Sequence, residues 1–314
     1  MDNNGRVLHL RLICPPARTD EVAAVLEDCP GVTNIVVLPG AARVPKGDVI
    51  ICDAARESAN EVLGRLKWLE TEGSIAVEQV DLSLSKVADD AIEEAPGAPD
   101  DAVIWEELAR KVSADSRITW AYLAFLAIAT QLAGIAVLQN SLVLIMGAMV
   151  LGPEFGPVAA ICFGLLRGKW PLIATAFRTL AVGFAVAIAI TFACALVSTW
   201  LGWIDMSNLD TNAEMEFIVK PDKWSFIVAL LAGVAGVLSI TAGKSSALIG
   251  VFISVTTVPA AGHAAVALAL GAWNEVAPSA WQLTVNILGM VISGTATLMV
   301  QRKFWPQVGR RSSV

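Results

Sequence analysis

The peptide Gly152-Pro153-Glu154-Phe155-Gly156-Pro157 interrupts an apolar stretch of the sequence that runs from residue 142 to residue 166. A second peptide, Thr256-Thr257-Val258-Pro259-Ala260-Ala261-Gly262, interrupts another apolar stretch that runs from residue 245 to residue 271. Proline lacks a backbone N–H and glycine lacks a side chain, so both residues end or weaken helices. Interrupted apolar segments in corresponding places of two halves are typical of membrane transporters, whose binding site lies at the interruptions.

Long apolar stretches fill the part of the chain around these two peptides. The sequence is 55% hydrophobic and only 16% charged, whereas a soluble domain is about 25% charged. About 20 apolar residues cross the hydrocarbon core of a bilayer as a helix. We therefore predict an α-helical polytopic membrane protein with six transmembrane spans, at residues 119–138, 142–166, 171–201, 224–243, 245–271 and 279–300.

The six predicted spans divide into two halves of three, and an odd number of spans gives the halves opposite orientations. The halves share weak sequence marks, since Trp120 and Asn140-Ser141 match Trp224 and Lys244-Ser245 at equal spacing. We therefore predict an inverted 3+3 repeat with two broken helices. Residues 152–157 and 256–262 should be non-helical and should lie near one another.

The first 85 residues have a different pattern, which predicts a soluble α+β domain. Among the first 100 residues, 18 Asp and Glu outnumber 9 Lys and Arg, against 11 and 13 in the remainder. Alternating apolar and polar positions predict strands, and Thr19 is expected to cap the first helix. The predicted elements follow the order βαββαβ of the ferredoxin-like fold: strand 7–14, helix 20–28, strands 34–38 and 48–52 joined by a loop, helix 57–72 and strand 75–84.

A linker region, residues 86–118, connects this domain to the transmembrane domain, residues 119–314. Its first part, 86–101, is acidic and contains two prolines that break helices. Residues 102–114 then form an amphipathic helix. Two placements remain open for it: on the membrane surface, or packed against the N-terminal domain or a neighbouring subunit.

Charge and cysteine usage exclude several classes of protein. The net charge of −7 argues against nucleic-acid binding. The five cysteines form no C-x-x-C pair, and we expect them to be free, buried thiols that behave as small hydrophobic residues. Basic residues flank the predicted spans on one side, which the positive-inside rule assigns to the cytoplasm. We therefore expect an inner-membrane protein with both termini in the cytoplasm.

The residues around the first interruption also resemble a known family. Gly147-Ala148-Met149-Val150-Leu151-Gly152-Pro153-Glu154-Phe155-Gly156-Pro157 is similar to the G-A-M-x-x-S-P-x-x-G-P signature of the domain-of-unknown-function 389 family. Residues 233–243, 248–251 and 258–259 resemble its second signature. The resemblance implies a membrane part preceded by a cytosolic domain, and it carries no established activity. Two positions depart from the pattern, because Gly152 stands in place of serine and Glu154 in place of an apolar residue.

Glu154 is the residue most indicative of chemistry. An ionisable group at membrane depth is energetically costly and usually faces a cavity, a partner or an ion path. The prolines on both sides of Glu154 prevent regular helical hydrogen bonds there. The sequence therefore predicts a proton or cation site at Glu154; the alternative is a solvated carboxylate near the membrane surface.

Other polar residues lie close to the second interruption or on the last span. His263 serves as a ligand or proton carrier, or else as a hydrogen-bonded structural residue. Thr256 and Thr257 line the same site or bond back to helix carbonyls. Asn286 and Gln282 lie on the sixth span, where hydrogen bonding between helices is the other possible role. The predicted solute- or ion-binding residues are Gly152, Pro153, Glu154, Gly156, Pro157, Thr256, Thr257, Pro259, His263 and Asn286.

The sequence contains no Walker loop, G-x-S-x-G elbow, H-E-x-x-H motif or Cys/His cluster. We therefore expect neither an enzyme nor a bound cofactor, and no metal is indicated by the pattern. The predicted function is a permease for a small solute or ion, in a homo-oligomer whose cytosolic domain regulates it or joins subunits. Two alternatives remain: an ion channel, and a membrane sensor that binds a ligand through its cytosolic domain without transport.

Overall fold

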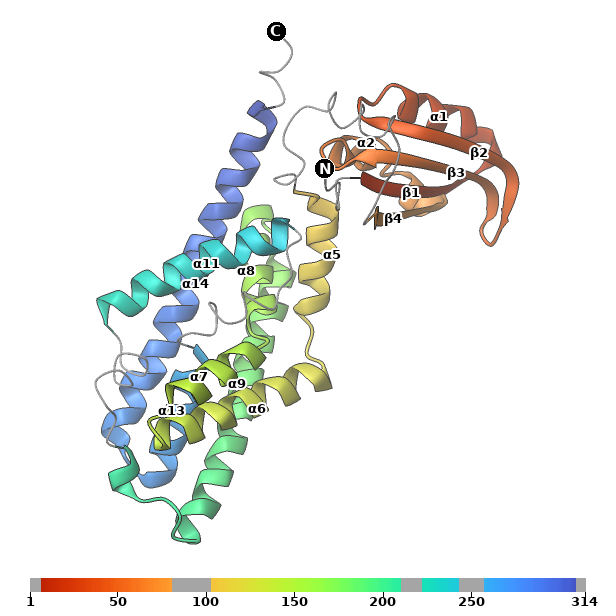
Figure 1. Cartoon of the computed structure of the whole chain (residues 1–314). Coiled ribbons are helices and arrows are strands. Elements are labelled where there is room, and N and C mark those ends of the chain that lie inside the picture. The colour runs from red at the N-terminus through yellow and green to blue at the C-terminus, as the bar shows by residue number, and fades with distance from the viewer. Residues whose placement is uncertain (1–6, 81–102, 210–221, 243–256, 309–314) are drawn as a thin grey trace. The chain divides into compact units, whose positions relative to one another are not determined.

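The computed structural model describes residues 7–80, 103–209, 222–242 and 257–308 (Figure 1). The contacts within the chain define two units: Met1–Leu108 with Arg302–Val314, and Ala109–Gln301. The acidic part of the predicted linker, residues 86–101, lies outside the described residues. Each unit is considered separately below.

The first unit contains a four-stranded antiparallel sheet of strand order β2-β3-β1-β4. The predicted order of strands and helices is present, but the second helix is divided into two. The elements are β1 (Val7–Cys14), a 3₁₀ turn (Pro16–Arg18), α1 (Thr19–Glu27), β2 (Val32–Arg43), β3 (Lys46–Ala55), α2 (Ala59–Arg65), α3 (Leu69–Glu72) and β4 (Ser74–Val80).

The core of this unit lies between one face of the sheet and the helices. Alternate residues of the central strands, such as Leu10 and Leu12 of β1 and Ile50 of β3, are fully buried. They pack against the apolar faces of α1 and of the α2–α3 segment. Cys52 belongs to the same core, and burial raises its pKa to about 12. The thiol is therefore neutral at pH 7 and acts as a small hydrophobic residue, as predicted.

Two local predictions for this unit are wrong. The predicted loop at residues 39–47 is largely strand, because β2 and β3 extend into a long hairpin. Thr19 does not cap α1: it is the first helical residue, and its hydroxyl donates to Asp48 at 2.6 Å. The Gly40 amide donates to the same carboxylate at 2.7 Å. These two bonds lower the pKa of Asp48. The Thr19 hydroxyl thus bonds to the buried Asp48 carboxylate instead of capping α1.

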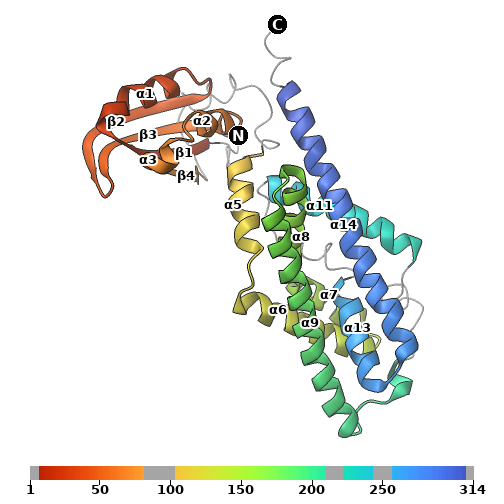
Figure 2. The same ribbon diagram turned by 180° about the vertical axis from the view of Figure 1, so that it is seen from behind.

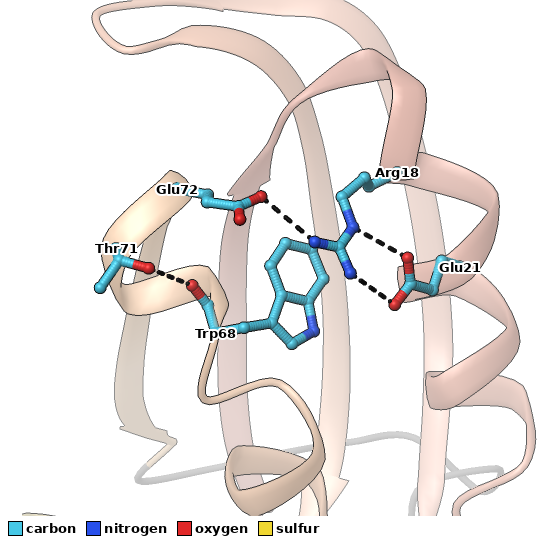
Figure 3. Close-up of polar contacts among 5 residues, drawn as sticks. All are labelled: Arg18, Glu21, Trp68, Thr71 and Glu72. Carbon is cyan, nitrogen blue, oxygen red and sulfur yellow. Dashed lines mark hydrogen bonds and ion pairs between the residues drawn. The ribbon is translucent and has the colours of Figure 1, made fainter.

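The division of the predicted helix 57–72 brings Trp68 beside the start of α1 (Figure 3). The Arg18 guanidinium stacks over the Trp68 ring, 3.6 Å from its centroid. It donates two hydrogen bonds of 2.8 Å to Glu21 and lies 3.3 Å from Glu72. This cluster joins the start of α1 to the α2–α3 segment.

The segment at the start of α5 (Trp105–Asp115) packs against the sheet domain. Ile104 is buried with Leu8 and Ala59. The Asn60 side chain donates to the Val103 carbonyl at 2.7 Å and accepts from the Trp105 amide at 3.1 Å. Of the two placements left open by the sequence, packing against the N-terminal domain is therefore the correct one for residues 103–105.

The second unit is helical, and its apolar helices indicate a multi-pass membrane protein. Four helices are long and apolar enough to cross a bilayer, and the pair α7–α8, bent by 54°, adds a fifth if it is counted as one span. The helices that follow α5 are α6 (Trp120–Leu138), α7 (Leu142–Leu151), α8 (Phe155–Arg167), α9 (Trp170–Trp200), α11 (Lys223–Ala242), α13 (Thr257–Leu270) and α14 (Trp273–Val308), with a 3₁₀ turn at Met206–Leu209.

The prediction of six spans is not met by the described residues. The first part of the predicted fifth span, residues 245–256, lies outside them, and α13 has only 14 residues. Many large apolar side chains on the long helices are exposed, among them Phe125, Phe177 and Val197, as lipid contact requires. Cys194 is also exposed on α9, which contradicts the expectation that all five thiols are buried.

Two tight turns give neighbouring helices opposite directions. Gly168 ends α8 with φ 65° and Gly271 follows α13 with φ 73°, a left-handed conformation that favours glycine. The next residue bonds back in the same way in both turns: Lys169 N to Gly164 O at 2.9 Å, and Ala272 N to Ala267 O at 2.9 Å. In both views α8 and α13 extend in opposite directions, each antiparallel to the long helix that follows it (Figures 1 and 2).

Glycines allow close helix crossings in this unit. A Cβ at Gly262 of α13 would lie 2.7 Å from Gly134 N and 2.9 Å from Thr130 O, both in the backbone of α6. Close backbone approach through small residues is the usual way in which helices associate in membranes. The crossing of α6 and α13 therefore depends on the absence of a side chain at Gly262.

The contacts of Ile104 predict that a fragment of residues 1–108 is more stable than a fragment of residues 1–85. Burying an isoleucine stabilises a fold by about 2 kcal/mol, and Ile104 is 3% exposed. Urea denaturation of the two fragments, followed by circular dichroism, measures the difference. Ile104→Ala should bring the longer fragment close to the shorter one. Equal midpoints for all three would contradict the packing.

The crossing at Gly262 predicts a second stability difference. Gly262→Ala forces backbone atoms apart, and overpacking of this kind costs about 1–3 kcal/mol. Gly147→Ala in α7 is the control, because no atom lies within 4 Å of a Cβ built there. Thermal unfolding in detergent should show a lower midpoint for Gly262→Ala alone. A midpoint of Gly262→Ala that equals the wild-type value would rule out the tight crossing.

Candidate functional site

The first interruption forms a short break between α7 and α8. Residues 152–154 are non-helical, as predicted, whereas Phe155, Gly156 and Pro157 already belong to α8. Proline is tolerated in the first turn of a helix because the first four N–H groups have no helical acceptor. The prediction of a non-helical segment is therefore correct for residues 152–154 and wrong for residues 155–157.

The second interruption is helical wherever it is described. The described part of α13 runs from Thr257 and includes Pro259. The prediction that residues 257–262 are non-helical is therefore wrong, since all of them belong to this helix. Thr256 lies outside the described residues.

A hydrogen bond joins the two interruptions. The Thr257 hydroxyl donates to Glu154 Oε1 at 2.6 Å, and both residues are fully buried. Glu154 directly precedes α8, and Thr257 belongs to α13. One buried carboxylate therefore connects the break between α7 and α8 to α13, and it forms no capping hydrogen bond with the first N–H groups of α8.

This contact lies beside the middle part of α9. Tyr122 of α6 packs against α9 at Gly183, where an added Cβ would lie 2.7 Å from its ring. Its hydroxyl lies within electrostatic range of Glu154. At 1.5 Å per residue, Gly183 lies about 20 Å from the start of α9 and about 25 Å from its end. Glu154 is fully buried, which argues against a solvated carboxylate.

Two side-chain contacts fix the level of α14 beside the break. His263 Nδ1 lies 2.7 Å from Ser279 Oγ, and the Cys162 thiol lies 3.6 Å from the Val291 carbonyl. Along the helix axis, Thr257 precedes His263 by about 9 Å, and Glu154 precedes Cys162 by about 12 Å. A step of about 9 Å forward from Ser279 and a step of about 12 Å back from Val291 both lead to residues 282–286 of α14. Gln282 and Asn286 thus lie at the level of the Glu154–Thr257 contact.

His263 forms a structural hydrogen bond. The Ser279 hydroxyl donates to the Glu275 carbonyl at 2.9 Å, which uses its single proton. His263 Nδ1 must therefore donate to Ser279 Oγ, and this bond holds α13 against α14. The structural alternative for His263 accounts for this contact, and no bond between His263 and Glu154 is seen among the described residues.

Polar groups at this level differ in how they are satisfied. Gln282 and Asn286 are fully buried, and Tyr122 is 7% exposed. Among the described residues, no hydrogen-bond partner is found for either amide atom of Gln282 or for the Tyr122 hydroxyl. Buried polar groups of this kind are rare. Together with Glu154 and Thr257 they form a polar centre inside an apolar bundle.

The sequence did not identify Tyr122 or Ser279 as site residues. Tyr122 is the only tyrosine of the chain. A single phenol near the start of an apolar span could have indicated a site residue. Nothing in the sequence placed Ser279 opposite His263. No group of three or more His, Cys, Asp or Glu side chains that could hold a metal ion occurs in the described parts of the chain.

Comparison with known proteins finds a distant relative of the chain. An uncharacterized protein of Methanocaldococcus jannaschii is 27% identical over 157 residues, which are 50% of this chain and 47% of that protein. The chain thus aligns with about half the length of this relative. No solved structure matches.

The resemblance seen in the sequence is confirmed for the membrane part of the chain. The family model described as a domain of unknown function, DUF389, matches residues 149–292, from the end of α7 into α14. This region contains Glu154, Thr257, His263 and Asn286, so the DUF389 match covers the site described above except Tyr122.

Proposed function

We propose that the protein is a membrane transporter for a small solute or ion, which binds where α8 and α13 meet. The observation that carries this proposal is the hydrogen bond between Glu154 and Thr257, which joins a buried carboxylate at the break between α7 and α8 to α13. Transporters with broken helices bind substrates and coupling ions at such breaks, near the middle of the bilayer. Glu154 is then the residue that binds the proton or the ion.

We infer that the transmembrane domain, residues 119–314, is an inverted repeat of two halves. Helices α6, α8 and α9 correspond to α11, α13 and α14. Three features support the correspondence: the prolines of α8 and α13, the identical turn bonds at Gly168 and Gly271, and the opposite directions of α8 and α13. Six spans in the bacterial inner membrane, with both termini in the cytoplasm, complete the proposal.

The N-terminal domain, which we interpret as ferredoxin-like, acts in this proposal as a regulatory or oligomerisation domain. Its edge strand β2 exposes the aliphatic side chains of Val36, Val37 and Leu38. Exposed edges of this kind pair readily with other chains. A homo-oligomer joined through this domain is consistent with that surface.

Transport requires that water reaches the site from each side of the membrane at different times. We expect Thr257→Cys, in a Cys194→Ser background, to react with an impermeant methanethiosulfonate reagent added from either side of a vesicle. Threonine and cysteine have similar volumes, so the helix start is retained. Val266→Cys is the unreactive control, because Val266 of α13 is buried against α6. Mass spectrometry measures the modified fraction of each variant.

The same variant separates the three possible functions. A transporter gives labelling from both sides without steady conductance in a planar bilayer, whereas an ion channel gives labelling together with conductance. A core that is sealed from both sides, with no labelling of Thr257→Cys, contradicts transport and favours a sensor in which the spans are only an anchor.

A further inference from the structure

We propose that one face of the N-terminal sheet binds the same face of a second copy of this chain, so that two subunits stack their sheets about a two-fold axis. This inference rests on the oligomerisation role proposed above and names the surface that carries it. The helices α1 and α2–α3 pack against one face of the sheet β2-β3-β1-β4. The side chains of the opposite face, the open face, alternate along each strand with those core residues.

The strand register arranges the open face in three rows that cross all four strands. The first row is polar and contains Thr33, Asp53, His9 and Glu78. His9 Nδ1 lies 2.8 Å from Asp53 Oδ1, and the Asn34 amide donates to Asp53 Oδ2 at 2.7 Å. Glu78 is exposed and forms no hydrogen bond or ion pair with another described residue. One end of this row is therefore an unpaired carboxylate.

The middle row is apolar apart from one arginine. It contains Val36, Ile51, Arg11 and Ala76. Val36 is 46% exposed. Arg11 is exposed as well and, like Glu78, forms no ion pair with another described residue. An unpaired arginine within an apolar surface is typical of protein interfaces, where arginine is enriched and lysine is depleted.

The third row is aliphatic over three of its four strands. Leu38, Val49 and Ile13 lie side by side, and Leu38 is 42% exposed. Together with Val36 and Ile51 of the middle row they form one apolar area on three adjacent strands. Exposed apolar areas that are bordered by polar residues mark contact surfaces.

A two-fold axis parallel to the strands, between β1 and β3, makes the open face complementary to itself. Such an axis places β3 of one copy over β1 of the other and keeps each row over the same row. The apolar rows then cover one another. Arg11 comes within one row of Asp53 of the partner subunit, a step of two residues that its long side chain spans. Glu78 faces the amide of Asn34 of the partner subunit, and each contact occurs twice.

The size of the open face fits a stable contact. Four strands about 4.8 Å apart, each with about seven residues of about 3.3 Å, give a plane of about 450 Å². Side chains that stand on this plane raise its accessible area toward the about 600–800 Å² that each partner contributes to a specific interface. Sheets in β-sandwiches pack face to face in this way, with their strands within about 30° of each other.

Charge and strand geometry disfavour two other contacts. Anionic lipid headgroups bind clusters of lysine and arginine, whereas in the three rows Asp53 and Glu78 outnumber Arg11. Pairing of the β2 edge with another strand is limited by Pro39, which has no N–H to donate, and by two irregularities in the register of β2. Stacking of the open faces covers Val36 and Leu38 without a continuous ladder of hydrogen bonds along this edge.

Cysteine cross-linking of the full-length protein, in a Cys194→Ser background, tests the contact in detergent and in proteoliposomes. Ile51→Cys lies beside the proposed axis and should give a covalent dimer with bismaleimidoethane. Val37→Cys is the matched control. Val37 is 38% exposed but pairs with Ile50, whose side chain lies in the core under the helices, so it points away from the open face. This variant should remain monomeric.

An exchange of charges tests the proposed register. Arg11→Glu in one chain, or Asp53→Lys in one chain, turns two attractive contacts into repulsive ones and should lower the dimer yield of Ile51→Cys about tenfold. Co-expression of the two variants should restore a dimer with one chain of each kind, because both contacts then join opposite charges. Two affinity tags identify that dimer, and circular dichroism checks that each variant is folded.

Three results would overturn the inference. Cross-linking of Val37→Cys, with or without Ile51→Cys, indicates pairing through the β2 edge. A product of Ile51→Cys that stays monomeric indicates that the open face is free or covered by something other than a second copy. A dimer yield that the charge exchange leaves unchanged contradicts the register. None of these results alters the labelling of Thr257→Cys, on which the transport proposal depends, and a sealed membrane core leaves the sheet contact unaffected.

Discussion

The transmembrane unit is organised around one constraint, the burial of the Glu154 carboxylate. Removing a carboxylate from water costs several kcal/mol even after the surroundings relax (about 3–5 kcal/mol where it remains unpaired). The Thr257 hydroxyl offsets this cost only if α13 lies beside the break between α7 and α8. A shift of α13 by one turn would separate the hydroxyl from the carboxylate.

Close packing holds α8 and α13 in place. α13 approaches α6 at Gly262 and Gly134, Tyr122 fills the space at Gly183, and Cys162 of α8 lies against Gly294 of α14. Lipid tails give no hydrophobic advantage to helix association, so contacts of this kind and interhelical hydrogen bonds must supply the specificity. The His263–Ser279 bond is one such contact. These contacts fix the positions of the helices, whereas the buried Gln282 amide takes no part in them.

The sequence predicted the long helices well because their ends have strong local signals. Tryptophan begins α6, α9 and α14, and glycine ends α8 and α13 in a left-handed turn. The prolines were interpreted less well, since proline breaks a helix in its interior yet starts one in its first turn, and the pattern alone does not separate these cases. Glu154 was identifiable because an ionisable group in an apolar stretch is unusual. Gln282 and Tyr122 were not assigned to the site, because their importance depends on which helices lie beside them.

The two halves of the proposed repeat share backbone geometry but differ in chemistry, and that difference bears on mechanism. Phe155 of α8 and Thr257 of α13 each precede a proline by two residues, yet the first is apolar and the second donates to the carboxylate. An inverted repeat with identical halves would place two carboxylates near the centre, and their mutual repulsion would keep at least one of them protonated. A single carboxylate, at a position where the family pattern has an apolar residue, gives one titratable site for each chain. Under the proposed transport function, this single site corresponds to one proton for each cycle, because Glu154 has no equivalent carboxylate in the described part of the second half.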